Sequence, residues 1–409
     1  MLRPVCLDVT RLVSRVGAGS HTGIDRTEYA YLRELLDLEM RLYGLARTAT
    51  GYVLLDRGGL RSLKARLDGA EPWGRYDVAA MLSRRLSPAR RTAEADLRRL
   101  SIAHARKGGL LRIASGLPAG CLYLNTGHSN LAKPVFDAIR QVGDARAAVL
   151  VHDTIPVRRP DLQRPGTPSR FDKKLLAVAN GADIVICTTG TERGHVEREI
   201  CNRGGRPVFV TAPLGIEEFS PPSACLADTT RESSFVVVGT IEPRKNLRLL
   251  IDVWNALVAD PPATGVPSLH IVGQRGWETP NVLARLDALK ARTSRVHEHG
   301  FLDDGAKAAL IARARALLFP TFDEGFGLPP LEALALGTPA VCSDLDVFRE
   351  TMGDAPVYAD PSDMYQWLGV VRDLAGDVGA MRAEILGRSQ GLALPSWRSH
   401  VNRVLSMIP

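Results

Sequence analysis

The sequence predicts an α/β protein with two domains, each built around a mostly parallel sheet. The chain has 409 residues, which is more than one ordinary hydrophobic core accommodates. Short apolar runs alternate with amphipathic stretches along almost its whole length, which is the pattern of βα units. This alternation lapses in the turn-rich stretch 213–231, which we interpret as the linker between the domains.

In the first half, six short apolar runs are expected to be strands, and an amphipathic helix is expected over 24–38 because Ile24, Tyr31 and Leu35 share one stripe. Residues 75–108 are interpreted as wholly helical and basic, an insertion without a strand. The expected strands are 5–9, 42–45, 122–125, 147–152, 183–187 and 208–211.

The second half repeats the pattern, with a clear helix over 247–258 and a last amphipathic helix over 396–408. We therefore expect a first domain over 1–215, carrying the basic insertion at about 56–112, a second domain over 216–395, and a terminal segment over 396–409. The expected strands of the second domain are 235–238, 269–272, 296–299, 316–319 and 340–342.

Composition favours a globular protein, since 45% of residues are apolar and 24% are charged. The six cysteines are scattered and form no CxxC pair, which argues against a zinc site or a disulfide framework and indicates a reducing compartment. Charges interrupt every apolar run well short of a membrane span. We expect a cytoplasmic protein.

Positive charge is concentrated in one segment. The net charge is +7, and residues 56–112 alone hold fourteen Lys/Arg against six Asp/Glu. One interpretation is a solvated helical face. The other is a surface that approaches anionic lipid or an acidic acceptor at the inner face of the membrane. Nucleic acid is not expected as a partner, because the segment lacks interleaved aromatic residues.

The most specific motif lies in residues 319–341. Glu324 and Glu332 are separated by seven residues that include glycines and prolines, and Pro330 and Gly337 suit the first turn and the end of a helix. Glu332 is thus expected in the first turn. Glycines let backbone amides approach a ligand, and a helix N-terminus attracts phosphate. The alternative is an ordinary βα turn with capping acids.

A second motif lies in residues 236–254, where Arg244 and Lys245 follow a strand that ends at Gly239. Two cations at the carboxyl end of a strand make a diphosphate site, because α/β folds bind ligands at that edge. The alternative is a pair of solvated surface cations. Weaker signals are His152 and Asp153 at another strand end, and a glycine-rich stretch at 15–26 that lacks the spacing of a phosphate-binding loop.

Together these motifs resemble the retaining glycosyltransferase family 4, and within it they look most like the mannosyl- and rhamnosyltransferases of bacterial surface polysaccharide assembly. The E-x7-E element matches at Glu324 and Glu332, and the diphosphate motif matches at 242–247. The resemblance is close over 147–400 and much weaker before, where it rests on 23–26. Shorter matches lie at 213–216, 271–273, 276–277, 300–302 and 343–345.

The resemblance implies the GT-B fold, two Rossmann-like domains facing each other across a cleft, with the terminal helix returning to the first domain. It implies catalytic roles for His152, Glu324, Arg244 and Lys245. Residues expected to bind the donor are Gly23, Thr240, Phe301, Leu302, Gly325, Phe326, Gly327, Leu328 and Glu332. Residues expected on the acceptor side are Asp25, Arg26, His128 and Asp153.

The expected activity is transfer of a hexose, mannose favoured, from a nucleotide diphosphate donor such as GDP-mannose to a saccharide or lipid-linked acceptor in surface polysaccharide synthesis. No residue is placed as a covalent nucleophile, which favours same-face attack with retention. No Asp-x-Asp triplet follows a strand in the manner of metal-dependent transferases, because Asp344 and Asp346 belong to a turn. Neither a metal nor another cofactor is therefore expected.

Two other functions remain open at this point. A sugar-nucleotide epimerase shares the architecture, and a degenerate transferase could act as a non-catalytic scaffold in a polysaccharide assembly complex. Release of UDP or GDP only in the presence of acceptor separates transfer from epimerisation. Retention of Arg244, Lys245, Glu324 and Glu332 argues against the scaffold.

Overall fold

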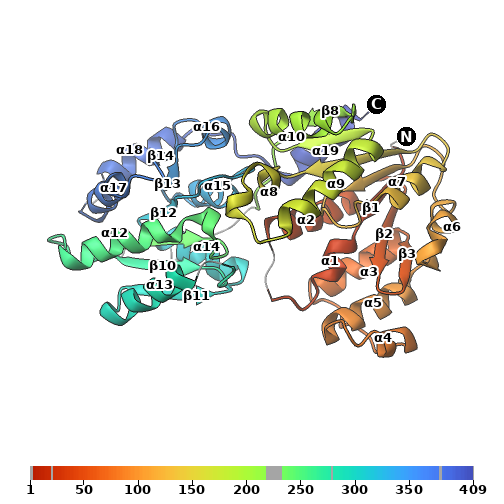
Figure 1. Ribbon diagram of the computed structural model, residues 1–409, viewed down its shortest axis with the longest axis horizontal. Coiled ribbons are helices and arrows are strands. Elements are labelled where there is room, and N and C mark those ends of the chain that lie inside the picture. Colours follow the sequence, from red (N-terminus) through yellow and green to blue (C-terminus); the bar gives the residue numbers. More distant parts are fainter. Residues whose placement is uncertain (1–2, 20–21, 218–232, 278–279, 377–379, 409) are drawn as a thin grey trace. The chain divides into compact units, whose positions relative to one another are not determined.

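The chain forms two compact units (Figure 1). In the computed structural model, residues 3–19, 22–217, 233–277, 280–376 and 380–408 are described. The first unit comprises Met1–Thr154, Ser169–Leu214 and Trp397–Pro409, and the second comprises Ile155–Pro168 and Gly215–Ser396. Most of the expected linker at 213–231 lies outside the described residues.

The first unit is built on an eight-stranded sheet with the order β4-β3-β2-β1-β5-β6-β7-β8. Neighbours from β2 to β8 run parallel, as the βα pattern predicts, whereas β3 pairs antiparallel with both β2 and β4. The strands are β1 (Val5–Asp8), β2 (Leu42–Thr48), β3 (Gly51–Leu55), β4 (Ala103–Arg106), β5 (Leu122–Asn125), β6 (Arg146–Val151), β7 (Ile184–Cys187) and β8 (Val208–Thr211). Its helices are α1 (Thr10–Ser14), α2 (Gly23–Asp37), α3 (Arg57–Leu67), α4 (Val78–Leu82), α5 (Pro88–Leu100), η1 (Lys107–Gly109), α6 (Leu110–Ala114), α7 (Lys133–Arg140), α9 (Thr167–Gly181), α10 (Gly190–Asn202) and α19 (Trp397–Met407).

The antiparallel edge corrects the prediction that residues 75–108 are wholly helical. β4 is a four-residue edge strand held by its ladder to β3, with Tyr52 opposite Ala105 and Val53 opposite His104. Only one of its four side chains is buried, so no apolar alternation marks it in the sequence. β3 was also not predicted, although all of its residues are buried.

The terminal helix α19 belongs to the first unit. His400 accepts a hydrogen bond from the Tyr31 hydroxyl of α2 at 2.6 Å through Nε2, and donates from Nδ1 to the Pro213 carbonyl at 2.8 Å. Both side chains are buried. These contacts tie α19 to α2 and to the chain just after β8.

Residues 155–168 belong to the second unit, although the sequence prediction placed them in the first domain. Arg158, at the end of α8 (Ile155–Arg158), pairs with Asp323 of the second unit at 3.2 Å. The local sequence does not predict that residues 155–168 belong to the second unit, because the ion pair joins residues far apart along the chain.

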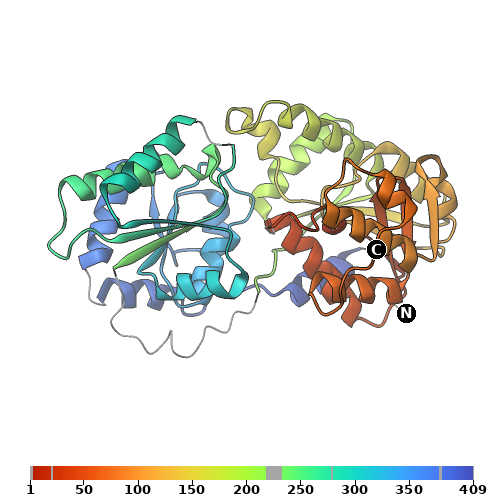
Figure 2. The same cartoon turned by 90° about the horizontal axis from the view of Figure 1, so that it is seen from below.

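The second unit has a six-stranded, wholly parallel sheet with the order β11-β10-β9-β12-β13-β14 and helices on both faces (Figure 2). Five strands were predicted, and the short β14 was not. The strands are β9 (Ser234–Val238), β10 (Ser268–Val272), β11 (Val296–Gly300), β12 (Ala316–Phe319), β13 (Ala340–Ser343) and β14 (Val357–Ala359). The helices are η2 (Pro160–Leu162), η3 (Pro243–Lys245), α12 (Leu247–Ala259), α13 (Pro280–Arg292), α14 (Asp304–Arg313), α15 (Leu328–Ala335), α16 (Asp346–Met352), α17 (Met364–Gly376) and α18 (Ala380–Ser389), with α8 as above.

The core of the second unit explains why its central helix forms. α12 buries Leu250, Trp254 and Leu257 against Phe235 of β9 and Trp367 of α17. The Trp254 and Phe235 rings meet edge to face at 5.9 Å. This packing fixes β9 and the start of α12, and therefore the loop that joins them at the carboxyl edge of the sheet.

Candidate active site

The loop between β9 and α12 presents two cations from a rigid turn. Pro243–Lys245 forms the 3-10 turn η3, and Asn246 adopts a left-handed backbone conformation with φ of 53°. The Asn246 side chain donates to the Pro361 carbonyl at 2.8 Å. Arg244 and Lys245 are thereby held directly before the first turn of α12, where the sequence placed them.

A second loop, following β12, is bound to the first. The Phe322 amide donates to the Arg244 carbonyl at 2.9 Å, and the Thr321 hydroxyl lies 3.0 Å from the same carbonyl. The Arg244 guanidinium donates to the Asp323 carbonyl at 2.9 Å. The two loops predicted to carry the site are therefore joined through Arg244.

The structure brings Glu324 together with both cations. Its Oε2 lies 2.8 Å from Lys245 Nζ and also accepts from Arg244, which in addition pairs with Glu242 at 2.9 Å. Burial raises the pKa of Glu324, but the charges of Arg244 and Lys245 outweigh burial and hold that pKa below its ordinary value. Glu324 is therefore ionised at neutral pH.

Burial is also the largest influence on Lys245, and the pKa of the ammonium is lowered although Glu324 raises it. The ammonium lies 4.4 Å from the centre of the Phe319 ring, a cation–π contact that compensates part of the lost hydration. Lys245 is thus a desolvated cation, and such a cation acts more strongly on a nearby anion than one in water.

Close backbone packing braces the loop at Thr240. Gly273, directly after β10, has φ of +154°, and a Cβ there would lie 1.9 Å from the Gly239 carbonyl oxygen. A Cβ on Gly276 would meet the Thr240 side chain at 2.6 Å. The Ile241 amide donates to the Gln274 carbonyl at 2.9 Å. Only glycine allows the loop after β10 to support the cationic loop so closely.

The E-x7-E element has a different helical register from the predicted one. α15 begins at Leu328 after Gly327, whose φ of 95° suits glycine, so Glu332 lies in the second turn and not in the first. Gly337 ends the helix with φ of 67°, as predicted. The buried Glu332 carboxylate faces Lys307 of α14 at 3.6 Å, a cation that the motif did not reveal.

The other predicted donor-binding residues of the second unit lie at the carboxyl ends of its strands. Thr240 is exposed after β9, and Phe301 and Leu302 follow β11 with Phe301 exposed. Gly325, Phe326 and Gly327 are buried in the loop after β12, and Leu328 begins α15. Gly23 is the first residue of α2 in the first unit.

Two histidines meet at the carboxyl edge of the first unit's sheet. The rings of His128 and His152 lie 4.9 Å apart, and both are buried. His152 Nε2 lies 2.8 Å from the Thr126 carbonyl oxygen, so Nε2 carries the hydrogen and Nδ1 is the acceptor. Burial lowers the pKa of His152 to about 4 and also lowers that of His128. Both rings are neutral at physiological pH.

Among the other residues predicted on the acceptor side, Asp25 stabilises the N-terminus of α2. Its carboxylate accepts from the Thr22 amide at 2.7 Å and from Arg11 at 2.5 Å, which caps α2. Arg26 is half-buried in the same turn, and Asp153 is half-buried directly after His152. Their predicted contacts with an acceptor stay predictions.

Sequence reasoning missed two buried carboxyl groups beside these histidines. Asp8 ends β1 and accepts from Tyr123 at 2.8 Å and from Asn130 at 2.9 Å. Glu28 of α2 accepts from the Leu12 amide at 3.0 Å, and burial raises its pKa well above the ordinary value. A polar residue at the end of an apolar strand was the available signal for Asp8. For Glu28 the signal was its position on the buried stripe of α2, in line with Tyr31 and Leu35.

The predicted turn that holds Asp344 and Asp346 lies between β13 and α16, and it ends at Asp346, where the helix begins. Asp344 is bound by Arg349 at 2.8 and 3.0 Å, and Asp346 begins α16. Among the described residues no group of three or more His, Cys, Asp or Glu is arranged to hold a metal ion.

Comparisons with known proteins identify relatives of this chain. Residues 232–377 match the family described as glycosyl transferases group 1. The chain is 30% identical over 261 residues to O-antigen chain mannosyltransferase B of Escherichia coli, a match that covers 62% of this chain and 63% of that protein. It is 32% identical over 207 residues to the GDP-mannose-dependent alpha-(1-6)-phosphatidylinositol dimannoside mannosyltransferase of Mycobacterium tuberculosis (strain ATCC 25177 / H37Ra), covering 47% of this chain and 51% of that protein.

Among solved structures, HepE of Anabaena in complex with UDP resembles the chain with a TM-score of 0.65 at 15% identity, covering 100% of both chains. This likeness shows the fold, two Rossmann-like domains of the GT-B class. The second unit, which holds the Arg244–Lys245–Glu324 cluster, contains a group 1 glycosyltransferase domain. The aligned region spans less than two thirds of the length of either mannosyltransferase named above. The predicted cleft between the domains stays a prediction.

Proposed function

We propose that the protein is a retaining, metal-independent glycosyltransferase that moves a hexose, mannose favoured, from a nucleotide diphosphate donor such as GDP-mannose to a saccharide or lipid-linked saccharide acceptor. The observation that carries the proposal is the cluster of Arg244, Lys245 and Glu324 at the carboxyl edge of the second sheet. The relatives support the choice of sugar, since both are named mannosyltransferases and one is named as dependent on GDP-mannose.

The two cations suit a leaving diphosphate. Arg244 offers several N–H groups and the desolvated Lys245 offers a concentrated charge, so they would bind the diphosphate oxygens as negative charge grows on them. Protein cations thus supply the neutralisation that a divalent ion supplies elsewhere. This is the reason for proposing transfer without a metal.

Glu324 is placed to orient the sugar. Its contacts with Arg244 and Lys245 all go to Oε2, so Oε1 can accept hydrogen bonds from sugar hydroxyls. Glu332, which is buried deeper in α15, is proposed to accept from the ribose, with Lys307 balancing its charge. The resemblance noted in the sequence assigns the same pair of roles.

The proposed reaction forms one bond and breaks one at the anomeric carbon. The bond from that carbon to the diphosphate oxygen breaks, and the nucleoside diphosphate leaves with the electron pair. The acceptor hydroxyl oxygen attacks from the same face, which retains the configuration, and its proton passes to the departing phosphate oxygen. Neutral His152 is proposed to hold a substrate hydroxyl through Nδ1.

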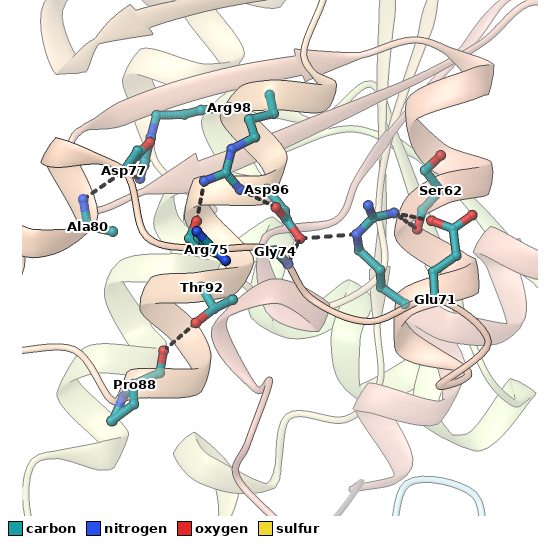
Figure 3. A network of polar contacts seen from close by, with 12 residues as sticks. Ser62, Glu71, Gly74, Arg75, Asp77, Ala80, Pro88, Thr92, Asp96 and Arg98 are labelled. Atoms are coloured by element: carbon teal, nitrogen blue, oxygen red, sulfur yellow. Dashed lines mark hydrogen bonds and ion pairs between the residues drawn. The ribbon is translucent and has the colours of Figure 1, made fainter.

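A peripheral contact with anionic membrane is proposed for the basic segment, although much of its charge is neutralised within the fold. Arg98 forms two hydrogen bonds to Asp77 at 2.6 and 2.7 Å, and Asp96 binds Arg66 at 3.1 Å and the Gly74 amide at 2.7 Å (Figure 3). These arginines stabilise the segment and are not available to a surface.

The surface proposed to contact a membrane is a small amphipathic one on and after α4. Val78, Met81 and Leu82 are 74%, 58% and 79% exposed. Arg84 and Arg85 follow them, are exposed, and form no ion pair with any described residue. Apolar side chains flanked by arginines fit an interface with anionic headgroups. In the part of the chain that the structure describes, no helix is both long and apolar enough to span a membrane.

A transfer assay tests the proposed activity. GDP-mannose labelled in the sugar is incubated with free and lipid-linked mannoside acceptors, and the product's anomeric configuration is read from the one-bond carbon–proton coupling. Acceptor-dependent release of GDP with an α-linked product supports the proposal. An epimerised sugar nucleotide, or release of GDP that ignores the acceptor, would contradict it, as would the absence of transfer from every nucleotide sugar tried.

A further inference from the structure

We propose that the first unit contains a second anion site, which binds a phosphate or diphosphate group carried by the acceptor. The site is a cluster of four cations, Arg11, Arg47, Arg170 and Lys174, here called the acceptor cations. The proposal rests on the proposed function, because the protein has an acceptor substrate only if it transfers a sugar.

Contacts within the first unit bring three elements to one place. The Arg47 amide, near the end of β2, donates to the Thr10 hydroxyl at 2.9 Å, next to Arg11 in α1. The loop after β5 passes against Arg11 so closely that a Cβ on Gly127 would lie 2.9 Å from the Arg11 Cβ. The acceptor cations of β2 and α1 therefore lie beside the loop that carries His128.

Helix α9 contributes the other two acceptor cations, Arg170 and Lys174. The ring of Phe171 lies 5.7 Å from that of His128. Lys174 lies one turn further along α9 on the same face, and Arg170 directly precedes Phe171. The charges are near enough to act on each other: after burial, Arg11, Arg170 and Arg47 all lower the pKa of Lys174.

The cluster carries more positive charge than the fold neutralises. Arg11 is paired with Asp25, but neither the Lys174 ammonium nor the Arg47 guanidinium forms an ion pair with any described residue. Glu28, the buried carboxyl group nearby, accepts a hydrogen bond from the Leu12 amide at 3.0 Å, and burial raises its pKa well above the ordinary value, which weakens it as a counter-charge. Gathering like charges destabilises a fold, so a cluster of this kind at a ligand-binding edge points to a bound anion.

Position and chemistry together indicate the ligand. β1, β2 and β5 all end here, and α/β folds bind ligands at the carboxyl ends of parallel strands. Guanidinium groups match the paired oxygens of phosphate, and an ammonium adds a point charge. The histidines beside the cluster are neutral and add hydrogen bonds without charge. A phosphate-bearing acceptor, rather than a neutral saccharide, is the substrate class that fits.

Inorganic pyrophosphate is the probe for this site, used on the full chain with the donor site disabled by K245A. Calorimetric titration of K245A should show pyrophosphate binding that K245A/K174Q weakens by about tenfold or more, since a charged hydrogen bond contributes roughly 1.5–3 kcal/mol. K245A/K173Q is the matched control, because Lys173 is the exposed neighbour on the same helix. Its affinity should stay unchanged.

Added GDP or UDP identifies the source of the anion. Pyrophosphate binding that withstands the nucleotide supports an acceptor site, whereas displacement by GDP or UDP would assign the cations to the donor and overturn the proposal. Absence of pyrophosphate binding to K245A, or equal affinity in K245A/K174Q, would also overturn it. Titration of wild type with GDP reports the proposed donor site separately: if GDP fails to bind there while K245A still binds pyrophosphate, the donor site is contradicted and the anion site is not.

Discussion

The chemistry of Glu324 follows from its immediate neighbours. A buried carboxyl group alone would tend to be neutral, and two cations from one short turn keep this one ionised. The ion pairs with Glu324 also fix the positions of the Arg244 and Lys245 side chains. The cluster is therefore preorganised, which is the property that makes charge effective at a transition state.

Removing either partner of this cluster should impair turnover without unfolding the protein. We expect E324Q and K245A each to lower kcat by roughly 10²–10³-fold, because each contact acts on charge that develops during the reaction. K133A, at an exposed Lys on α7 paired with Asp137, is the matched control and should be fully active. Near-normal transfer by E324Q or K245A at an unchanged melting temperature would remove that residue from the site.

The same cations lead to a prediction about metal ions. Since Arg244 and Lys245 are proposed to neutralise the leaving diphosphate, transfer should proceed at an unchanged rate in excess EDTA. The check is a rate comparison with and without the chelator. Loss of activity that Mg²⁺ or Mn²⁺ restores would show that the cations are not sufficient.

At the scale of elements, the loop after β10 supports the cationic loop through Gly273. We expect G273A to lower the free energy of unfolding by about 1–3 kcal/mol and to weaken donor binding, because its Cβ would collide with the Gly239 carbonyl. Gly265 offers a matched control, since it also has a positive φ but a Cβ there meets nothing within 4 Å. G265A that impairs donor binding as much as G273A would show that backbone strain alone, and not the contact, is responsible.

Helix α19 should make the first unit sensitive to acid. Burial lowers the pKa of His400 to about 4, below the ordinary 6.5, so the neutral ring is favoured in the folded state. This stability is fully present above about pH 6.5 and is lost as pH falls towards 4, with a loss of roughly 2 kcal/mol at pH 5. Urea unfolding of wild type, H400Q and the exposed-site control H104Q at pH 7.5 and 5 measures it. H400Q should depend less on pH; an equal dependence in all three would refute the assignment.

The elements show what could be predicted from sequence and what could not. Buried parallel strands such as β9 and β12 can be predicted because they are apolar runs. The helices α2 and α12 can be predicted from their apolar stripes. The edge strand β4 could not be predicted, because its stability comes from pairing with β3 rather than from its own side chains. The local motifs named Arg244, Lys245 and Glu324, which the structure brings together. The cations Lys307 and Lys174 come from distant elements and were not predicted.

At the scale of the whole molecule, charge predicted from the sequence is not the same as charge presented by the fold. In the basic segment, Arg98 is bound to Asp77 and Arg90 to Glu94, whereas Arg84 and Arg85 are exposed beside the apolar residues of α4. A membrane contact would therefore depend on the cations that stay exposed rather than on the full net charge.

Liposome flotation tests this surface. We expect the protein to float with phosphatidylglycerol vesicles at low salt and not at high salt, since each exposed arginine contributes about 1 kcal/mol before screening. R84S/R85S and, separately, M81S/L82S should reduce flotation, whereas R98S should act only through stability. Equal flotation with neutral vesicles, or no effect of R84S/R85S, would leave these residues as a solubilising face.

The central claim is that the second unit binds a nucleotide sugar through its diphosphate at Arg244 and Lys245. A thermal-shift panel of nucleotide sugars tests it most directly, because a ligand stabilises the folded state in proportion to RT ln(1 + [L]/Kd). We predict that GDP-mannose raises the Tm of wild type and of K133A, and raises that of K245A far less at the same concentration. A Tm that no nucleotide sugar changes, or an equal shift in K245A and wild type, would contradict the claim.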